Sequence, residues 1–170
     1  TCCVTIARAA TGRRTVLMAN GSYHGALPWC TPMPLGTVPE DKSHQIRFTY
    51  NDAESLHHAA EQAGDDLAAI LLTGFRHDNV VAQDLPSAEF ALTARAICDA
   101  RGAALIVDDV RAGFRLHRGG SFERVGVRAD LAAWSKAIAN GHPLAAVTGG
   151  EAWREAASKV FVTGSFWCAA

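Results

Sequence analysis

Two short runs of the chain are apolar at every position, and they constrain its fold more than any other feature. Residues 67–72 and 103–107 contain no polar side chain. A strand with one face in water alternates apolar and polar residues, so a continuous apolar run indicates a strand that is covered on both faces. Between the two runs, Phe90, Ala94 and Ile97 recur at helical spacing. Strand, helix and strand in this order predict an α/β fold, a three-layer sandwich with a mostly parallel sheet.

The remaining segments extend this alternation. Asn51 to Glu54 resembles a capping box and opens a helix that runs to about Ala63. Pro86 and Ser87 begin the helix that Gly102 ends. We also expect the end of a helix at 2–10, strands at 15–19, 130–136 and 144–148, a turn at 20–25, a long excursion at 28–42 and a helix at 151–159.

Composition narrows the class of function. The chain has 170 residues, with 16 basic and 17 acidic side chains and a formal net charge of -1. These charges are scattered, so the basic stripe of a protein that binds nucleic acid or an anionic membrane is missing. A chain of this length suits one domain that buries about two-thirds of its unfolded surface. Small-molecule chemistry is the favoured function.

A membrane-spanning protein and a fold held together by disulfides are disfavoured as well. The apolar runs are far shorter than the ~20 residues that a membrane helix requires. The five cysteines form no CxxC pair and lie mostly among apolar residues, which argues against a disulfide framework or a zinc site. We therefore expect a soluble protein of the reducing cytoplasm.

Charged residues follow two of the expected strands at the edge where α/β sheets bind ligands. Asp108 ends the strand at 103–108, and Lys136 ends the strand at 130–136. The turn at 21–25, with Tyr23 and His24 between glycines, adds an aromatic side chain that can stack on a ring. An amine, an acid and an aromatic face are the parts that a pyridoxal phosphate (PLP) enzyme needs.

Each charged residue has a role in such chemistry. A carboxylate at Asp108 would keep a pyridinium nitrogen protonated, because an adjacent anion favours the charged form. Lys136 would bind the cofactor aldehyde as an imine and then carry the substrate's Cα proton as a general base. A lysine that is partly desolvated beside a cationic ring is nucleophilic near neutral pH.

Other interpretations of these residues stay open. Asp108 and Lys136 would also suit a structural ion pair, and Asp108 with Asp109 a Mg²⁺ site. The acid pair and a later lysine suggest a phosphoacceptor signalling module, although Asp130 begins its strand instead of ending it. A non-catalytic α/β structural or dimerisation module is a third possibility.

Several other polar residues have ordinary interpretations. His57 and His58 are neighbours on one helix and cannot share a metal through the same face, so we expect them in solvent. His77 and Asp78 suit a loop. Arg115 would orient a carboxylate or complete a structural salt bridge, and we favour the structural role.

Taken together, the motifs resemble those of the class III, fold-type I PLP-dependent aminotransferases over essentially the whole chain. The matching segments are 21–25 for the tyrosine-histidine-glycine turn, 105–115 for the strand with the ring-nitrogen aspartate, 130–143 for the Schiff-base lysine, and 163–167 for the stretch that reaches the partner subunit's phosphate. The residues of these motifs are most similar to those of the glutamate-1-semialdehyde aminomutase-like branch of the family.

The resemblance implies a function and a set of roles. The function is PLP-dependent transfer of an amino group between an amine or amino acid and a carbonyl acceptor, with an intramolecular 2,1-aminomutase as the alternative. Lys136 would form the internal aldimine and Asp108 would contact the ring nitrogen. The cofactor-binding residues would be Tyr23, His24, Asp108, Val110, Lys136 and Ser165, with Ser165 acting across a homodimer.

Two departures and one boundary qualify the resemblance. Asp109 stands where the family usually has a glutamate, and Thr73 to Phe75 replaces a glutamate-proline segment, so the substrate is less certain than the cofactor. The family's phosphate-binding loop would precede Thr1, and its small domain would follow Ala170. We therefore expect residues 1–170 to be a PLP-binding large domain that is incomplete at both ends.

Overall fold

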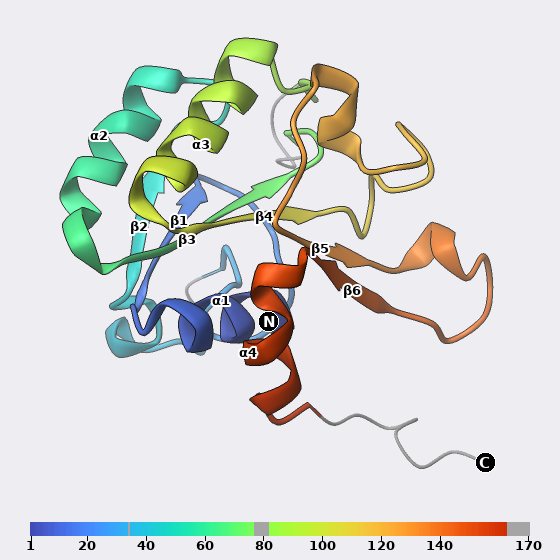
Figure 1. The fold of residues 1–170 in the computed structure, drawn as a ribbon, viewed down its shortest axis with the longest axis horizontal. Coiled ribbons are helices and arrows are strands. Elements are labelled where there is room, and N and C mark those ends of the chain that lie inside the picture. The colour runs from blue at the N-terminus through green and yellow to red at the C-terminus, as the bar shows by residue number, and fades with distance from the viewer. Residues whose placement is uncertain (34, 77–81, 163–170) are drawn as a thin grey trace.

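A six-stranded sheet forms the centre of the computed structural model, which describes residues 1–33, 35–76 and 82–162 (Figure 1). The strand order is β2-β1-β3-β4-β5-β6, and every neighbouring pair is parallel except β5 and β6. The strands are β1 Thr15–Ala19, β2 Gln45–Phe48, β3 Leu67–Thr73, β4 Ala104–Asp108, β5 Leu131–Trp134 and β6 Ala146–Gly149. The mostly parallel sheet expected from the apolar runs is thereby confirmed.

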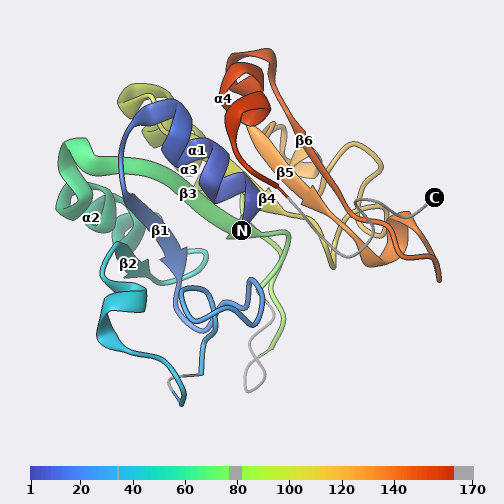
Figure 2. The same cartoon turned by 90° about the horizontal axis from the view of Figure 1, so that it is seen from below.

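Helices cover both faces of this sheet and complete the three layers (Figures 1 and 2). On one face lie α2 Ala53–Ala63 and α3 Ala88–Arg101, and on the other lie α1 Cys2–Thr11 and α4 Arg154–Lys159. Short 3-10 helices occupy Pro39–Lys42, Gly64–Asp66, Ser121–Val125, Lys136–Ile138 and Glu151–Trp153. Each face has its own core of buried side chains, so β3 and β4 are covered on both sides.

The helix boundaries follow the local signals in the sequence, except that the N-cap of α2 is Asp52 and not Asn51, the first residue of the expected capping box. The Asp52 side chain accepts a hydrogen bond from the backbone N–H of Ser55 and caps α2. The Ser87 hydroxyl does the same for Phe90 at the start of α3, and Gly102 ends that helix in a left-handed conformation. These caps satisfy backbone groups that the helix itself leaves unpaired.

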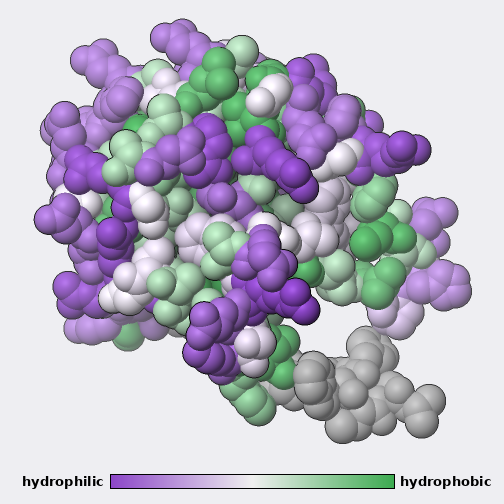
Figure 3. Space-filling model, in the orientation of Figure 1, coloured by the Kyte–Doolittle hydropathy of each residue, from purple (hydrophilic) through white to green (hydrophobic). Residues whose placement is uncertain are grey.

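Both edges of the sheet depart from expectation. Strand β2 was not predicted, because Gln45–Phe48 is short and mixes polar with apolar residues. The strand expected at 144–148 is β6 at Ala146–Gly149, and it runs antiparallel to β5. Leu144 and Val147 are about half exposed there, and Figure 3 shows hydrophobic surface on the right, where Figure 1 has the β5–β6 connection.

Among the described helices, none is both long and apolar enough to cross a lipid bilayer. Among the described residues, the thiols of Cys2, Cys3, Cys30 and Cys98 are free.

Candidate active site

A cavity of about 240 Å³ at the carboxyl ends of β1, β4 and β5 contains the acid, the amine and the aromatic side chain that the sequence singled out. It is lined by Tyr23, His24, Gly25, Asp108, Val110, Arg111 and Lys136. We call it the front cavity. Five of the six proposed site residues therefore lie together, and the sixth, Ser165, is outside the described residues.

Strand register explains why residues distant in sequence meet here. Asp108 is the last residue of β4 and pairs with Thr73 on one side and with Ala133 on the other. The chain then reaches Lys136 three residues after Ala133. Because parallel strands end at the same edge, the two charged residues come to one side of the sheet.

Lys136 has a backbone conformation that few side-chain-bearing residues adopt. Strand β5 ends at Trp134, two residues earlier than the sequence suggested, and Lys136 follows with a φ of 50°. A left-handed conformation costs an L-residue about 1–2 kcal/mol. Such strain often marks a functional position. The Lys136 side chain is exposed, so these residues do not supply the desolvation that we expected for it.

Described residues on both sides of Asp108 form hydrogen bonds to its carboxylate. Its Oδ2 lies 2.8 Å from His24 Nδ1, and its Oδ1 accepts a bond from the Val110 backbone N–H at 3.2 Å. The His24 side chain is 2 % exposed and that of Asp108 is 17 % exposed. His24 was predicted as a cofactor-binding residue, and the structure pairs it with the Asp108 carboxylate. This partnership fixes the orientation of the Asp108 carboxylate at the cavity wall.

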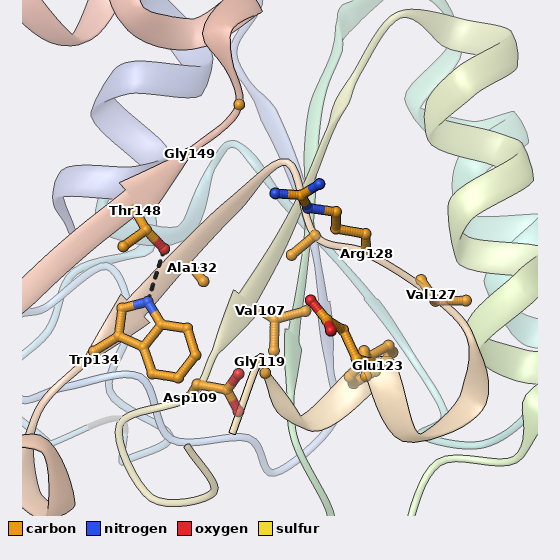
Figure 4. Close-up of a pocket in the computed structure, with 14 residues that line it drawn as sticks. Val107, Asp109, Gly119, Glu123, Val127, Arg128, Ala132, Trp134, Thr148 and Gly149 are labelled. Atoms are coloured by element: carbon orange, nitrogen blue, oxygen red, sulfur yellow. Dashed lines mark hydrogen bonds between the residues drawn. The ribbon is translucent and has the colours of Figure 1, made fainter. Parts of the chain in front are cut away.

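Asp109 points to the opposite side of the sheet. It lines a second cavity of about 130 Å³ with Glu123, Arg128 and Trp134, which we call the back cavity (Figure 4). Asp109 is 1 % exposed, and its Oδ2 accepts a hydrogen bond from the Ser121 backbone N–H. Burial raises the pKa of its carboxyl group above the ordinary value.

Asp108 and Asp109 face opposite sides of the sheet, and this excludes a Mg²⁺ site formed by the two carboxylates together. Adjacent residues of an extended chain face opposite sides, so Asp108 and Val110 line the front cavity while Val107 and Asp109 line the back cavity. Two carboxylates on opposite sides cannot share one ion. Within residues 1–33, 35–76 and 82–162, no group of three His, Cys, Asp or Glu side chains is placed to hold a metal.

The acid just before β5 and the two histidines of α2 lie apart from the front cavity. Asp130 accepts hydrogen bonds from the Leu105 backbone N–H and from Arg95, and so joins β4 to α3. This carboxylate therefore has a structural role and does not act as a phosphoacceptor. His57 and His58 are exposed on α2, as expected. His77 and Asp78 lie outside the described residues.

One residue of the front cavity, Arg111, was not predicted from the sequence to belong to the site. Arg111 follows Val110 and lines the front cavity, and its guanidinium carbon lies 5.5 Å from the centre of the Phe75 ring. The sequence pattern could not reveal this, because Phe75 belongs to the segment after β3 and meets Arg111 only in the folded sheet.

A mostly parallel α/β sheet, with an acid and a lysine from neighbouring strand ends in one cavity, is the arrangement expected of a fold-type I PLP enzyme. The class-III aminotransferase family profile matches residues 2–167. This chain belongs to the class-III aminotransferase family.

Known proteins of the family are similar to this chain over nearly all of it. It is 49 % identical over 167 residues to the aminopentol aminotransferase of Sphingopyxis macrogoltabida, covering 98 % of this chain and 40 % of that protein. It is 35 % identical over 159 residues to a glutamate-1-semialdehyde 2,1-aminomutase of Rhodopirellula baltica, covering 85 % of this chain and 35 % of that protein. The chain thus spans about 40 % of the length of the first of these relatives.

Solved structures agree with the fold. The FumI protein of Sphingopyxis sp. MTA144, in its PLP internal aldimine form, superimposes with a TM-score of 0.95 at 49 % identity. That match covers 98 % of this chain and 40 % of the FumI chain.

Proposed function

We propose that this chain is the cofactor-binding part of a PLP-dependent aminotransferase. The enzyme moves an amino group between an amine or amino acid donor and a carbonyl acceptor. The observation that carries the proposal is the meeting of Asp108 and Lys136 in the front cavity, from two neighbouring strands. The membership of the class-III aminotransferase family supports the same reaction.

The residues of the front cavity fit the cofactor. An aldehyde needs an amine, a pyridinium nitrogen needs an anion and a flat ring needs an apolar or aromatic neighbour, and the cavity offers all three. Asp108 would stand at the ring nitrogen, Tyr23 and Val110 at the ring, and Lys136 at the aldehyde. When bound, PLP supplies an electron sink for the electrons of the substrate's Cα–H bond.

The chain's own groups divide the remaining work. Asp108 keeps a negative charge at one end of the cavity, and the His24 ring holds that carboxylate in place. Lys136 Nζ would be the attachment point. Once the substrate's amino group has replaced it there, the freed amine would accept the proton from the substrate's Cα and donate it to the carbon of the cofactor's former aldehyde group. A positioned general base of this kind contributes about 10²–10⁴-fold in rate.

We further propose the assembly and location of the whole protein. Residues 1–170 form part of its large domain, and the protein is a homodimer in which Ser165 contacts the phosphate bound by the partner subunit. The cysteine pattern and the scattered charges favour the cytoplasm.

The test is chemical mapping of the attachment point in the full-length protein. Borohydride reduction of the PLP-loaded protein, followed by peptide mass mapping, should place the pyridoxyl mass on Lys136. Lys42 and Lys159 serve as internal controls, since they lie in the 3-10 helix Pro39–Lys42 and in α4, away from the front cavity. A pyridoxyl mass on either of them, or on no lysine, would contradict the proposal.

A 2,1-aminomutase is the second candidate, because aminomutases are among the relatives at 35 % identity. A mutase returns the nitrogen to the molecule that supplied it, whereas an aminotransferase passes it to a second molecule. Incubating an ¹⁵N-labelled amino donor with an unlabelled acceptor and following the label by mass spectrometry distinguishes the two. We expect the label on the acceptor.

A further inference from the structure

The hydrogen-bonded ladder between β4 and β5 ends before it reaches Lys136. Asp108 pairs with Ala133, and the Asp109 backbone N–H donates to the Ala133 carbonyl oxygen at 3.0 Å. Beyond this point the chain continues as the turn that follows Asp108 and, from β5, as the segment that carries Lys136. Pairing between these two strands alone therefore does not set the distance between Asp108 and Lys136.

Trp134, two residues before Lys136, connects the two segments. Its ring lies against Gly113, where an added Cβ would come within 2.7 Å of the indole. The centre of the Trp134 ring is 5.3 Å from that of Phe114, and the two ring planes are inclined at 50°. The indole N–H donates to Thr148 Oγ1 at 2.8 Å, so β6 holds the ring as well (Figure 4). We call the contact between Phe114 and Trp134 the aromatic clasp.

Phe114 has a strained backbone conformation at this contact. Its φ is 61°, in the left-handed region where a bulky residue is an outlier. Glycine would adopt this conformation without steric cost, yet the residue here is a phenylalanine that is 49 % exposed. A half-exposed ring stabilises the fold less than a buried one. Because such strain clusters at functional sites, the conformation indicates a role besides packing.

We propose that Phe114 is a positioning residue, whose ring, stacked on Trp134, sets the position of the Lys136 amine relative to Asp108. The inference rests on the proposed function. PLP is a rigid ring, so its nitrogen and its aldehyde can meet the acid and the amine together only at one separation of the two side chains. The aromatic clasp joins the turn after Asp108 to the strand that leads to Lys136 and so fixes this separation. A misplacement of about 1 Å at a reacting group can lower a rate by about 100-fold.

The first experiment separates attachment of the cofactor from its binding. PLP at a saturating concentration is added to the cofactor-free, full-length protein, and the appearance of visible absorbance reports the reaction of its aldehyde with the lysine. We expect Phe114→Ala to slow this reaction by about 10-fold or more, and Phe114→Tyr, which keeps the ring, to stay within about 2-fold of wild type.

Binding is measured with an analogue that cannot react. Deoxypyridoxine phosphate has a methyl group in place of the aldehyde, and its affinity, measured by calorimetry, should be the same in wild type, Phe114→Ala and Phe114→Tyr. A weaker affinity in Phe114→Ala would show that Phe114 helps to bind the cofactor itself, and would overturn the proposal.

A glycine variant distinguishes positioning from stability. Glycine relieves the left-handed strain that alanine retains, so Phe114→Gly should unfold at a higher urea concentration than Phe114→Ala. Both variants lack the ring, so Phe114→Gly should attach PLP no faster than Phe114→Ala. If Phe114 served only to stabilise the fold, the attachment rate would follow the urea midpoint and the glycine variant would be the faster of the two. That result would overturn the proposal.

Phe161 provides a matched control. It is 88 % exposed and follows α4, outside the aromatic clasp. Phe161→Ala removes the same side chain and should leave the attachment rate unchanged. An equal loss in Phe114→Ala and Phe161→Ala would show that the effect does not depend on the clasp, and the proposal would be wrong.

A double variant tests whether Phe114 acts through Trp134. In a Trp134→Leu background, Phe114→Ala should slow attachment by less than about 2-fold further, because the partner of its ring is already gone. A further loss of about 10-fold would mean that Phe114 acts by another route, which would overturn the proposal. If Trp134→Leu does not fold, the alanine and glycine variants of Phe114 decide the question.

Failure of the two proposals can be told apart. Wild type that shows no visible absorbance after PLP loading would refute the proposed function, and the role of Phe114 with it. Normal absorbance in wild type, together with wild-type attachment rates in Phe114→Ala and Phe114→Gly, would overturn the role of Phe114 alone.

Discussion

The front and back cavities begin at adjacent residues of one strand, yet their side chains are held differently. At the front, Asp108 is partly exposed, Lys136 is exposed and strained, and Tyr23 is 49 % exposed. At the back, Asp109 is almost fully buried, and the Trp134 indole N–H donates to Thr148 Oγ1 at 2.8 Å (Figure 4). One acid has access to a ligand and the other is part of the packing.

This difference shows how one strand end can serve chemistry and stability together. Extended residues alternate between the two sides of a sheet, so a change of one position moves a side chain from one cavity to the other. The same substitution at Asp108 and at Asp109 should therefore affect different properties. The following predictions use that contrast, from the largest expected effect to the smallest.

Asp108→Asn should lower the rate of a single turnover with an amino donor by about 100-fold or more, as expected for an electrostatic group at the reacting centre. A neutral amide cannot hold the ring nitrogen protonated. Stopped-flow absorbance of the full-length protein measures the rate. Asp109→Asn is the matched control, and its rate should stay within about 3-fold of wild type. Similar losses in both variants would mean that the two sides of β4 do not differ in function.

Gly113→Ala should lower the free energy of unfolding by about 1–3 kcal/mol, the usual cost of overpacking, here beside the back cavity. A Cβ at Gly113 would lie 2.7 Å from the Trp134 ring and 2.7 Å from the Asp109 carbonyl oxygen, and neither can move easily. Urea unfolding of the full-length protein measures the loss.

The control for this prediction lies on the same segment. At Gly119 an added Cβ would meet the Glu123 carboxylate, the far end of an exposed and flexible side chain. Gly119→Ala should therefore cost less than Gly113→Ala. A reversed order would show that the region around Trp134 is looser than the structure indicates.

Asp109→Asn should change stability by less than about 1 kcal/mol, because an amide oxygen can still accept the bond from Ser121 N–H. Its effect should depend on pH. Burial raises the pKa of Asp109 above its ordinary value of 3.8, so the folded state binds the proton more tightly than the unfolded state. Wild type therefore loses stability relative to the variant as pH rises from about 3.8 through the raised pKa.

Urea unfolding at pH 4 and pH 7 measures this dependence. We expect the stability of Asp109→Asn relative to wild type to be higher at pH 7 than at pH 4. No change between the two pH values, or a change of opposite sign, would show that burial does not govern this carboxyl group.

Local features of the sequence determined most of the fold. The continuous apolar runs predicted β3 and β4 and their burial on both faces. The order of apolar and polar residues along a strand indicates which of its faces are buried. The segment 51–54, Ser87 and Gly102 predicted helix ends, because a cap bonds to residues only three or four positions away. The charged ends at Asp108 and Lys136 indicated the front cavity for a related reason, since parallel strands end at one edge.

Tertiary structure alone decided the contacts between distant segments. Four residues of mixed polarity gave no sign of β2, and only pairing with β5 fixed the antiparallel direction of β6. His24 meets Asp108 across 84 positions, and Arg111 meets Phe75 from another strand. Sequence patterns carry periodicity and local hydrogen bonding, whereas such pairs depend on register, on strand order and on which side of the sheet each residue faces.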